Sequence, residues 1–134
     1  MKDISPVGFF ATDFSVTSEN GVLITAFGAP YTEGDDFYLM LQHKLIRNEE
    51  HEKFGMGQPY IEYCGQGWSW YGHIISFRLA RDNVTVQMDK EAATHMGNDG
   101  LIRVAFSISD NDFNSLRAAL QTTFNGYSYY LAEA

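Results

Sequence analysis

The chain has 134 residues, of which 45% are hydrophobic and 19% charged, a composition typical of one globular domain spanning residues 1–134. Nine basic residues against seventeen acidic ones give a formal net charge of −8, which argues against direct binding to nucleic acid or to an anionic membrane. A single cysteine, Cys64, excludes an intramolecular disulfide, and the first residues hold no apolar run of signal-peptide length, so we expect a cytoplasmic protein.

The acidic balance of the chain has two interpretations. It keeps a small protein soluble, or it attracts a basic partner over a long range. Composition does not separate these two interpretations, and it leaves the oligomeric state open, a homo-oligomer included.

Strands are predicted for the first part of the chain. Apolar side chains alternate with polar ones from Phe10 to Val16, which is typical of a strand with one buried face. Asn20 and Gly21 form the strongest short signal for a tight hairpin turn. The segment 21–28 that follows is apolar on both faces, as a central strand of a sheet is.

A loop over residues 29–36 leads into a second group of predicted elements. Residues 36–46 form a long strand, and the polar segment 47–57 is either a loop or a short helix. Two further strands are expected at 59–63 and 73–80, joined by a glycine-rich stretch that contains both tryptophans of the chain.

The last third of the chain combines strands and helices. Residues 81–83 are a tight turn into a strand that ends at Met88. Residues 89–97 are a short helix that Gly97 closes. A strand over 101–108 follows, in which alternate side chains face the core.

The clearest helix lies at the C-terminal end. Ser109 and Asp112 fit a capping box, which marks a helix start, and Gly126 follows the helix end. Apolar residues recur between them at helical spacing: Phe113, Leu116, Leu120 and Phe124. The whole pattern predicts an α+β, β-dominated fold, in which about seven to eight mostly antiparallel strands carry a C-terminal helix packed on one face.

The stretch GQGWSWYGHI, residues 65–74, is the most unusual part of the sequence. In an unbroken strand, the alternation of side chains places Trp68 and Trp70 on the same solvent face as Arg78. Ile75 then points into the core. Exposed indole rings are typical of a partner-binding surface.

A β-bulge at Gly72 is the alternative, because a bulge resets the alternation and places the tryptophans in the core. The sequence alone leaves this choice open. The partner-binding hypothesis comprises Trp68, Trp70, Tyr71, Glu62 and Arg78.

Glu62, Cys64 and His73 are the residue types of a nucleophilic site. No recognisable nucleophile motif surrounds Cys64, and no cluster of residues has the spacing of metal ligands, so we predict neither catalysis nor a metal or cofactor. Glu62 itself is either a buried charge paired with Arg78 or Arg81, or an exposed contact for a partner.

An ordered series of short matches to a known family runs through the second half of the chain. The series comprises Tyr60-Ile61-Glu62, Gln66-Gly67, Ser69, Tyr71-Gly72, Ile74, Leu79-Ala80-Arg81, Val84-Thr85-Val86, Glu91-Ala92-Ala93, Met96-Gly97, Ile102-Arg103-Val104-Ala105-Phe106 and Leu116-Arg117-Ala118-Ala119-Leu120, and it ends at Phe124. On these residues, roughly 58–124, the chain resembles the immunity protein 10 family of bacterial polymorphic-toxin systems. His73 departs from the pattern, which leads us to expect a small residue such as glycine there.

The resemblance implies a small cytoplasmic protein that binds and neutralises a toxin protein and catalyses no reaction. A second hypothesis, from the residues, is a small-ligand module in which Trp68, Trp70 and Tyr71 stack on a sugar or another flat apolar ligand. A third is an enzyme that uses Cys64 or His73. The sequence does not identify the toxin.

Overall fold

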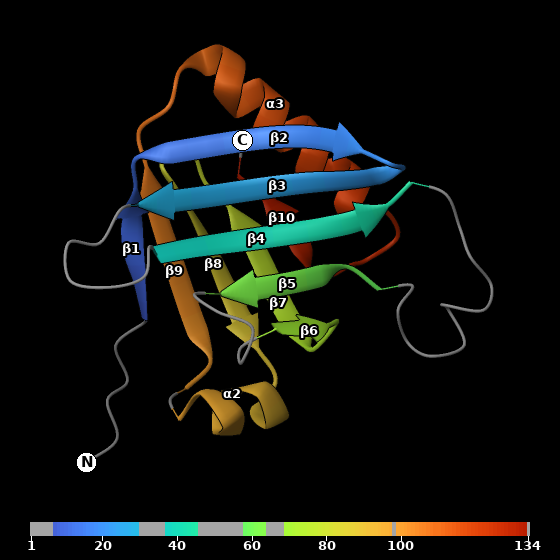
Figure 1. The fold of residues 1–134 in the computed structure, drawn as a ribbon. Coiled ribbons are helices and arrows are strands. Elements are labelled where there is room, and N and C mark those ends of the chain that lie inside the picture. Colours follow the sequence, from blue (N-terminus) through green and yellow to red (C-terminus); the bar gives the residue numbers. More distant parts are fainter. Residues whose placement is uncertain (1–6, 30–36, 46–57, 64–68, 98, 134) are drawn as a thin grey trace.

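The computed structural model of the chain describes residues 7–29, 37–45, 58–63, 69–97 and 99–133. Within these ranges, ten strands form two five-stranded sheets, and two helices accompany them (Figure 1). The strands are β1 (Val7–Ala11), β2 (Asp13–Glu19), β3 (Val22–Ala29), β4 (Phe37–Lys44), β5 (Tyr60–Tyr63), β6 (Ser69–Tyr71), β7 (Ile74–Leu79), β8 (Asn83–Met88), β9 (Leu101–Phe106) and β10 (Tyr130–Ala132). The helices are α2 (Lys90–Met96) and α3 (Asp110–Thr123).

The predicted class, α+β with dominant β structure and a C-terminal helix, is confirmed. The predicted number of strands is too low, because ten are present in the described part of the chain. Two of them, β6 and β10, have three residues each, which is too short to produce a recognisable alternation.

The two sheets differ in connectivity. The order β2-β3-β4-β5-β6 is antiparallel throughout and follows the chain, so we name it the meander sheet. The order β1-β9-β8-β7-β10 contains parallel pairs at both edges, where β1 joins β9 and β10 joins β7, and we name it the mixed sheet. Figure 1 shows the meander sheet in front, with its strands running across those of the mixed sheet behind.

The chain passes between the sheets at two sharp corners. Thr12 separates β1 from β2, and its N–H donates to the carbonyl oxygen of Gly28 at 2.9 Å. Gly72 and His73 separate β6 from β7, and both have the left-handed backbone, with φ of 79° and 63°. The predicted strand from Phe10 to Val16 is therefore wrong, because its two halves belong to different sheets.

The core lies between the inward faces of the sheets, where large side chains of both meet. Phe27 on β3 stacks on Phe106 of β9 with ring centroids 5.5 Å apart. Phe9 on β1 lies 6.4 Å from the ring of Tyr63 on β5. The apolar side chains that alternate along each strand are thus buried against the other sheet.

The helices close opposite ends of the space between the sheets (Figure 1). Helix α3 contacts β2 and β3 and buries Leu116 and Leu120 as predicted, and the ring of Phe124 lies 4.7 Å from that of Phe77. Helix α2 begins at the side chain of Asp89, which accepts from an N–H of the first turn, and ends at Gly97 with φ of 74°. Neither helix of the described residues is long and apolar enough to cross a membrane.

Candidate functional site

The strand β6 separates the neighbours Trp70 and Tyr71 onto opposite faces. Trp70 pairs with Ile61, which is buried, so its side chain turns inward and packs against the core. Its ring meets the ring of His95 on α2 edge-on at 6.0 Å. Tyr71 pairs with Tyr60 on the outward face and is 37% exposed. The two rings therefore do not form one surface.

Of the two alternatives left open for this stretch, the unbroken strand is not observed, and the alternation is reset next to Gly72 as in the other alternative. Gly72 and His73 break the strand, and the pairing of β7 with β8 shifts between Ile74 and Ser76. Ile74 consequently takes the buried position, whereas Ile75, which was expected in the core, is 56% exposed. The alternation that was predicted to carry from the tryptophans to β7 is reset at this corner.

The residues of the partner-binding hypothesis lie in separate places. Glu62 and Tyr71 lie on the outward face of the meander sheet, and Trp70 lies on its inward face. Arg78 is exposed on the outward face of the mixed sheet. Trp68 lies outside the described residues. The structure thus brings together two of the predicted residues, Glu62 and Tyr71.

Glu62 is a carboxylate with only 8% of its surface exposed. Its Oε1 accepts a hydrogen bond from the hydroxyl of Tyr60 at 2.5 Å, and its Oε2 accepts one from the hydroxyl of Tyr38. Of the two alternatives left open for Glu62, the structure shows the buried carboxylate, but with tyrosine partners in place of Arg78 or Arg81. Arg81 donates instead to Asp110 at 2.9 Å, and Arg78 belongs to the other sheet.

The surroundings of the Tyr60 hydroxyl favour its protonated form, which donates a hydrogen bond. Burial raises the pKa of the Tyr60 hydroxyl above its ordinary value, and the hydrogen bond to Glu62 raises this pKa further. The hydroxyl therefore stays protonated at neutral pH and donates to the carboxylate. The ring of Tyr60 also lies 5.1 Å from the ring of Tyr71, tilted by 56°.

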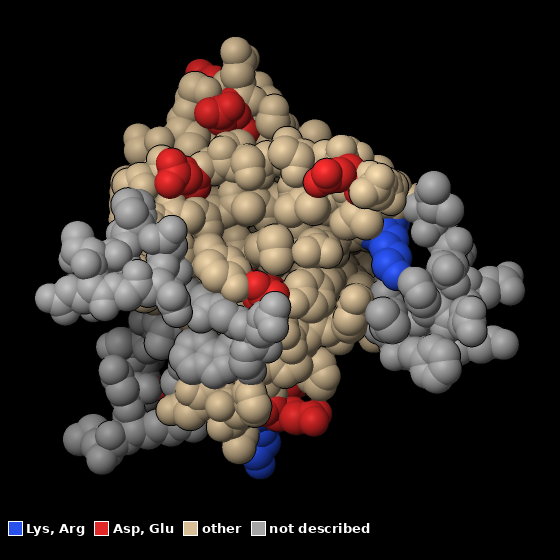
Figure 2. Space-filling view, viewed as in Figure 1, with Lys and Arg blue, Asp and Glu red and all other residues tan. Residues whose placement is uncertain are grey.

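The outward side chains of β4, β5 and β6 form a continuous surface around Glu62. We call it the tyrosine face, and it comprises Tyr38, Met40, Gln42, Tyr60, Glu62, Ser69 and Tyr71, with Lys44 at the end of β4 on the same side. Figure 2 shows that the described part of this side of the molecule is largely uncharged, with acidic and basic groups near its edges and one acidic group in its middle.

Tyr38 and Tyr60 were missed from the sequence as site residues. The spacing of Tyr60 and Glu62, two apart on one strand, was the available signal, because such residues share a face. Tyr38 left no comparable signal, since it is 24 residues from Glu62 and meets it only through strand pairing.

His73 connects the corner between β6 and β7 to helix α2 through a side-chain contact. Its Nδ1 lies 2.8 Å from Oδ2 of Asp89, whose Oδ1 accepts the N–H of Ala92 at 2.9 Å. Glu62 and His73 therefore have different partners, and Cys64 lies outside the described residues. The left-handed backbone at His73 also explains why a small residue such as glycine is expected there.

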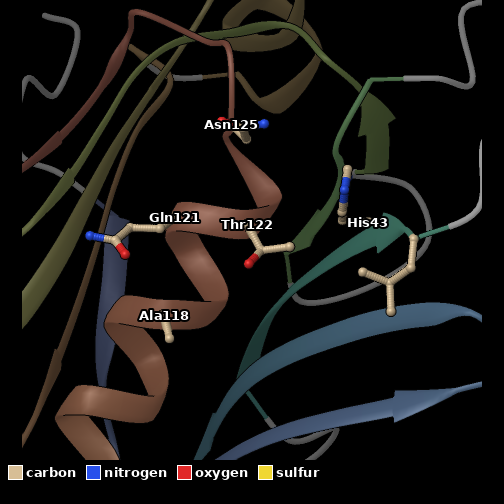
Figure 3. Close-up of a pocket in the computed structure, with 6 residues that line it drawn as sticks. His43, Ala118, Gln121, Thr122 and Asn125 are labelled. Carbon is tan, nitrogen blue, oxygen red and sulfur yellow. The ribbon is translucent and has the colours of Figure 1, made fainter.

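A hollow of about 540 Å³ lies between the end of β4 and helix α3. Figure 3 shows His43 on the strand side and Thr122 and Asn125 on the helix side. Burial lowers the pKa of His43, so its ring is neutral at pH 7. The hollow offers neutral hydrogen-bonding groups, and none of the predicted site residues lines it.

A family model for immunity protein 10 matches residues 10–114 of the chain. The chain belongs to the immunity protein 10 family. The match overlaps the second-half likeness up to residue 114 and extends into the first half, where the sequence shows no distinctive resemblance. All residues of the tyrosine face lie within the part that matches the family. A search of curated proteins finds no match.

Proposed function

We propose that this chain neutralises a protein toxin by binding it directly and without catalysis. Membership of the immunity protein 10 family supports the proposal, because the family description states immunity. The formal net charge of −8 suits the attraction of a partner that carries basic groups. In this proposal the chain acts as one domain in the cytoplasm, where the toxin would otherwise act.

We propose the tyrosine face as the surface that contacts the toxin. The observation that carries this choice is the buried Glu62 carboxylate, held by Tyr38 and Tyr60 in the middle of a largely uncharged surface (Figure 2). Interface centres are enriched in tyrosine and depleted of exposed charge. Tyr71 adds an exposed ring at the β6 edge of the same face.

The small-ligand hypothesis has less support. It requires aromatic rings that converge on one ligand, whereas Trp70 and Tyr71 point to opposite faces of β6. The hollow that Tyr60 and Tyr71 help to line has a volume of about 30 Å³. That volume is close to the share of one water molecule in the liquid and does not admit a sugar ring.

Paired substitutions on the two outward faces test the proposed surface. Tyr71→Ala should weaken binding to the toxin by about 30-fold, the equivalent of about 2 kcal/mol for an interface aromatic residue. Ile75→Ala is the matched control, because Ile75 is also large and exposed but lies on the mixed sheet. Binding is measured by titration calorimetry with the toxin domain encoded beside this gene.

The same variants are compared for their ability to protect cells that express the toxin. We expect wild type and Ile75→Ala to protect and Tyr71→Ala to protect poorly. Equal affinity of both variants for the toxin would remove the tyrosine face from the proposal. Failure of the wild-type chain to bind the toxin would overturn the proposed function itself.

A further inference from the structure

Glu62 carries a negative charge that no cation balances in the described part of the chain. Arg81 pairs with Asp110, and His73 lies beside Asp89, so neither of these groups contacts Glu62. Taking a carboxylate out of water costs several kcal/mol before any compensation. Two neutral tyrosine hydroxyls compensate part of this cost at Glu62. A carboxylate has about four acceptor positions, so both oxygens retain acceptor capacity.

An exposed aromatic ring lies diagonally across the strand pair from this carboxylate. Glu62 pairs with Ser69, and Tyr60 pairs with Tyr71, so Glu62 and Tyr71 are diagonal neighbours on one face. Such neighbours have backbones about 7–8 Å apart, a distance that long side chains span. The face of a tyrosine ring attracts a cation. A carboxylate and an aromatic ring at this spacing are the two contacts that a guanidinium group uses together.

We propose that Glu62 and Tyr71 receive an arginine side chain of the toxin. This inference rests on the proposed function and specifies the chemistry of the partner. The guanidinium donates two N–H groups to the two oxygens of Glu62 while its plane lies against the ring of Tyr71. Arginine fits better than lysine, because its planar fork matches a carboxylate with two hydrogen bonds and also stacks on an aromatic ring.

The arrangement favours this contact because the carboxylate is already positioned before binding. Tyr38 and Tyr60 hold its oxygens, so little side-chain freedom is lost when the arginine arrives. The basic groups that Figure 2 draws in blue lie at the edges of this side of the molecule, away from its middle. The net charge of −8 attracts a basic partner toward the molecule as a whole.

The experiment is a double-mutant cycle that combines Glu62→Gln with substitutions of arginines in the toxin domain encoded beside this gene. Each of these arginines is changed in turn to Met and to Lys. Glu62→Gln should weaken binding by at least about tenfold, as is typical of a close charge pair at an interface. In the background of one Arg→Met toxin variant, the same substitution should have no further effect. The Arg→Lys variant at that position should recover only part of the affinity.

The matched control is Glu19→Gln, which removes the same charge from the exposed end of β2 on the same sheet and should change the affinity less than about twofold. If Glu62→Gln behaves like Glu19→Gln, or if no toxin arginine couples to it, the inference is overturned and the proposed function stands. If Glu62→Gln does not fold, as judged by its thermal melt, the toxin variants are measured against the wild-type chain. An affinity that no Arg→Met change lowers beyond about twofold would then also overturn the inference.

Discussion

The outward faces of the two sheets differ in how far their charged side chains are exposed. On the meander sheet, the charge of Glu62 is buried and held by two tyrosine hydroxyls. On the mixed sheet, Arg78 and Arg103 lie exposed on either side of Thr85, because β8 pairs with both of their strands. A polar hollow of about 330 Å³ runs along these residues.

The difference supports the choice of the tyrosine face in the proposed function. Exposed charges are screened by water and salt, so the arginines of the mixed sheet contribute little to a defined contact. Among the large exposed apolar side chains of that sheet, Phe10 lies on the edge strand β1, whereas Ile75 and Leu131 lie on the neighbouring strands β7 and β10 at the other side of the sheet. A desolvated and hydrogen-bonded carboxylate has a fixed position and is far less screened. The tyrosine face therefore has the features of a specific interface, and the mixed sheet those of a solvated surface.

The two sheets should differ most strongly in their tolerance of an added methyl group. A Cβ on Gly8 would lie 1.7 Å from the carbonyl oxygen of Arg103, where β1 joins the mixed sheet. Gly8→Ala should therefore lower the free energy of unfolding by an amount at the upper end of about 1–3 kcal/mol. Urea denaturation measures this change.

Gly28→Ala is the matched control on the meander sheet. A Cβ there would meet the carbonyl oxygen of Phe37 at 3.7 Å, which is an ordinary contact. We expect a change within about 0.5 kcal/mol. Equal losses for Gly8→Ala and Gly28→Ala would show that close backbone packing does not distinguish the sheets.

A smaller effect is expected at Trp70, on the inward side of the strand that carries Tyr71. Trp70 is half-buried, so Trp70→Ala should lower the free energy of unfolding by about 2 kcal/mol, roughly half the loss for a fully buried tryptophan. Toxin affinity of the folded protein should stay near that of wild type. A Trp70→Ala variant that melts normally but binds the toxin weakly would restore the partner-contact role that the sequence suggested.

The smallest effect is expected at Arg78, which is exposed on the mixed sheet. Arg78→Ala should change the free energy of unfolding by less than about 0.5 kcal/mol, because it removes neither a buried group nor a described ion pair. Its toxin affinity should remain within about twofold of wild type. A larger loss of affinity for Arg78→Ala than for Tyr71→Ala would indicate that the binding surface lies on the mixed sheet.

Local signals predicted the helices well. Ser109 caps α3 by accepting the N–H of Asp112 at 3.1 Å, and the same pattern at Asp89 and Gly97 delimits α2. Caps depend on residues within one turn of each other, so a sequence pattern contains the whole interaction. The inward-facing apolar positions of β8 and β9 were predictable for a similar reason, since alternation within one strand is local.

The candidate site was only partly predictable. Glu62 and Tyr71 were both named from the sequence, but their grouping with Trp70 and Arg78 was incorrect in space. Alternation is informative only while a strand continues in the same sheet. The left-handed residues Gly72 and His73 end that continuity, and a positive φ stays uncommon at any single non-glycine residue even though histidine adopts it more often than most.

The sequence by itself determined the fold class, the capped helices, the acidic character and the family resemblance, because each depends on composition or on residues close together in the chain. Only the tertiary structure decided that Trp70 packs inward, that Ile75 is exposed, and that Glu62 is held by Tyr38 and Tyr60. The hydroxyl of Tyr38 comes from 24 residues away and reaches the carboxylate because β4 and β5 pair in a particular register. That register results from burying the opposite faces of both strands against the mixed sheet, which is a property of the whole chain.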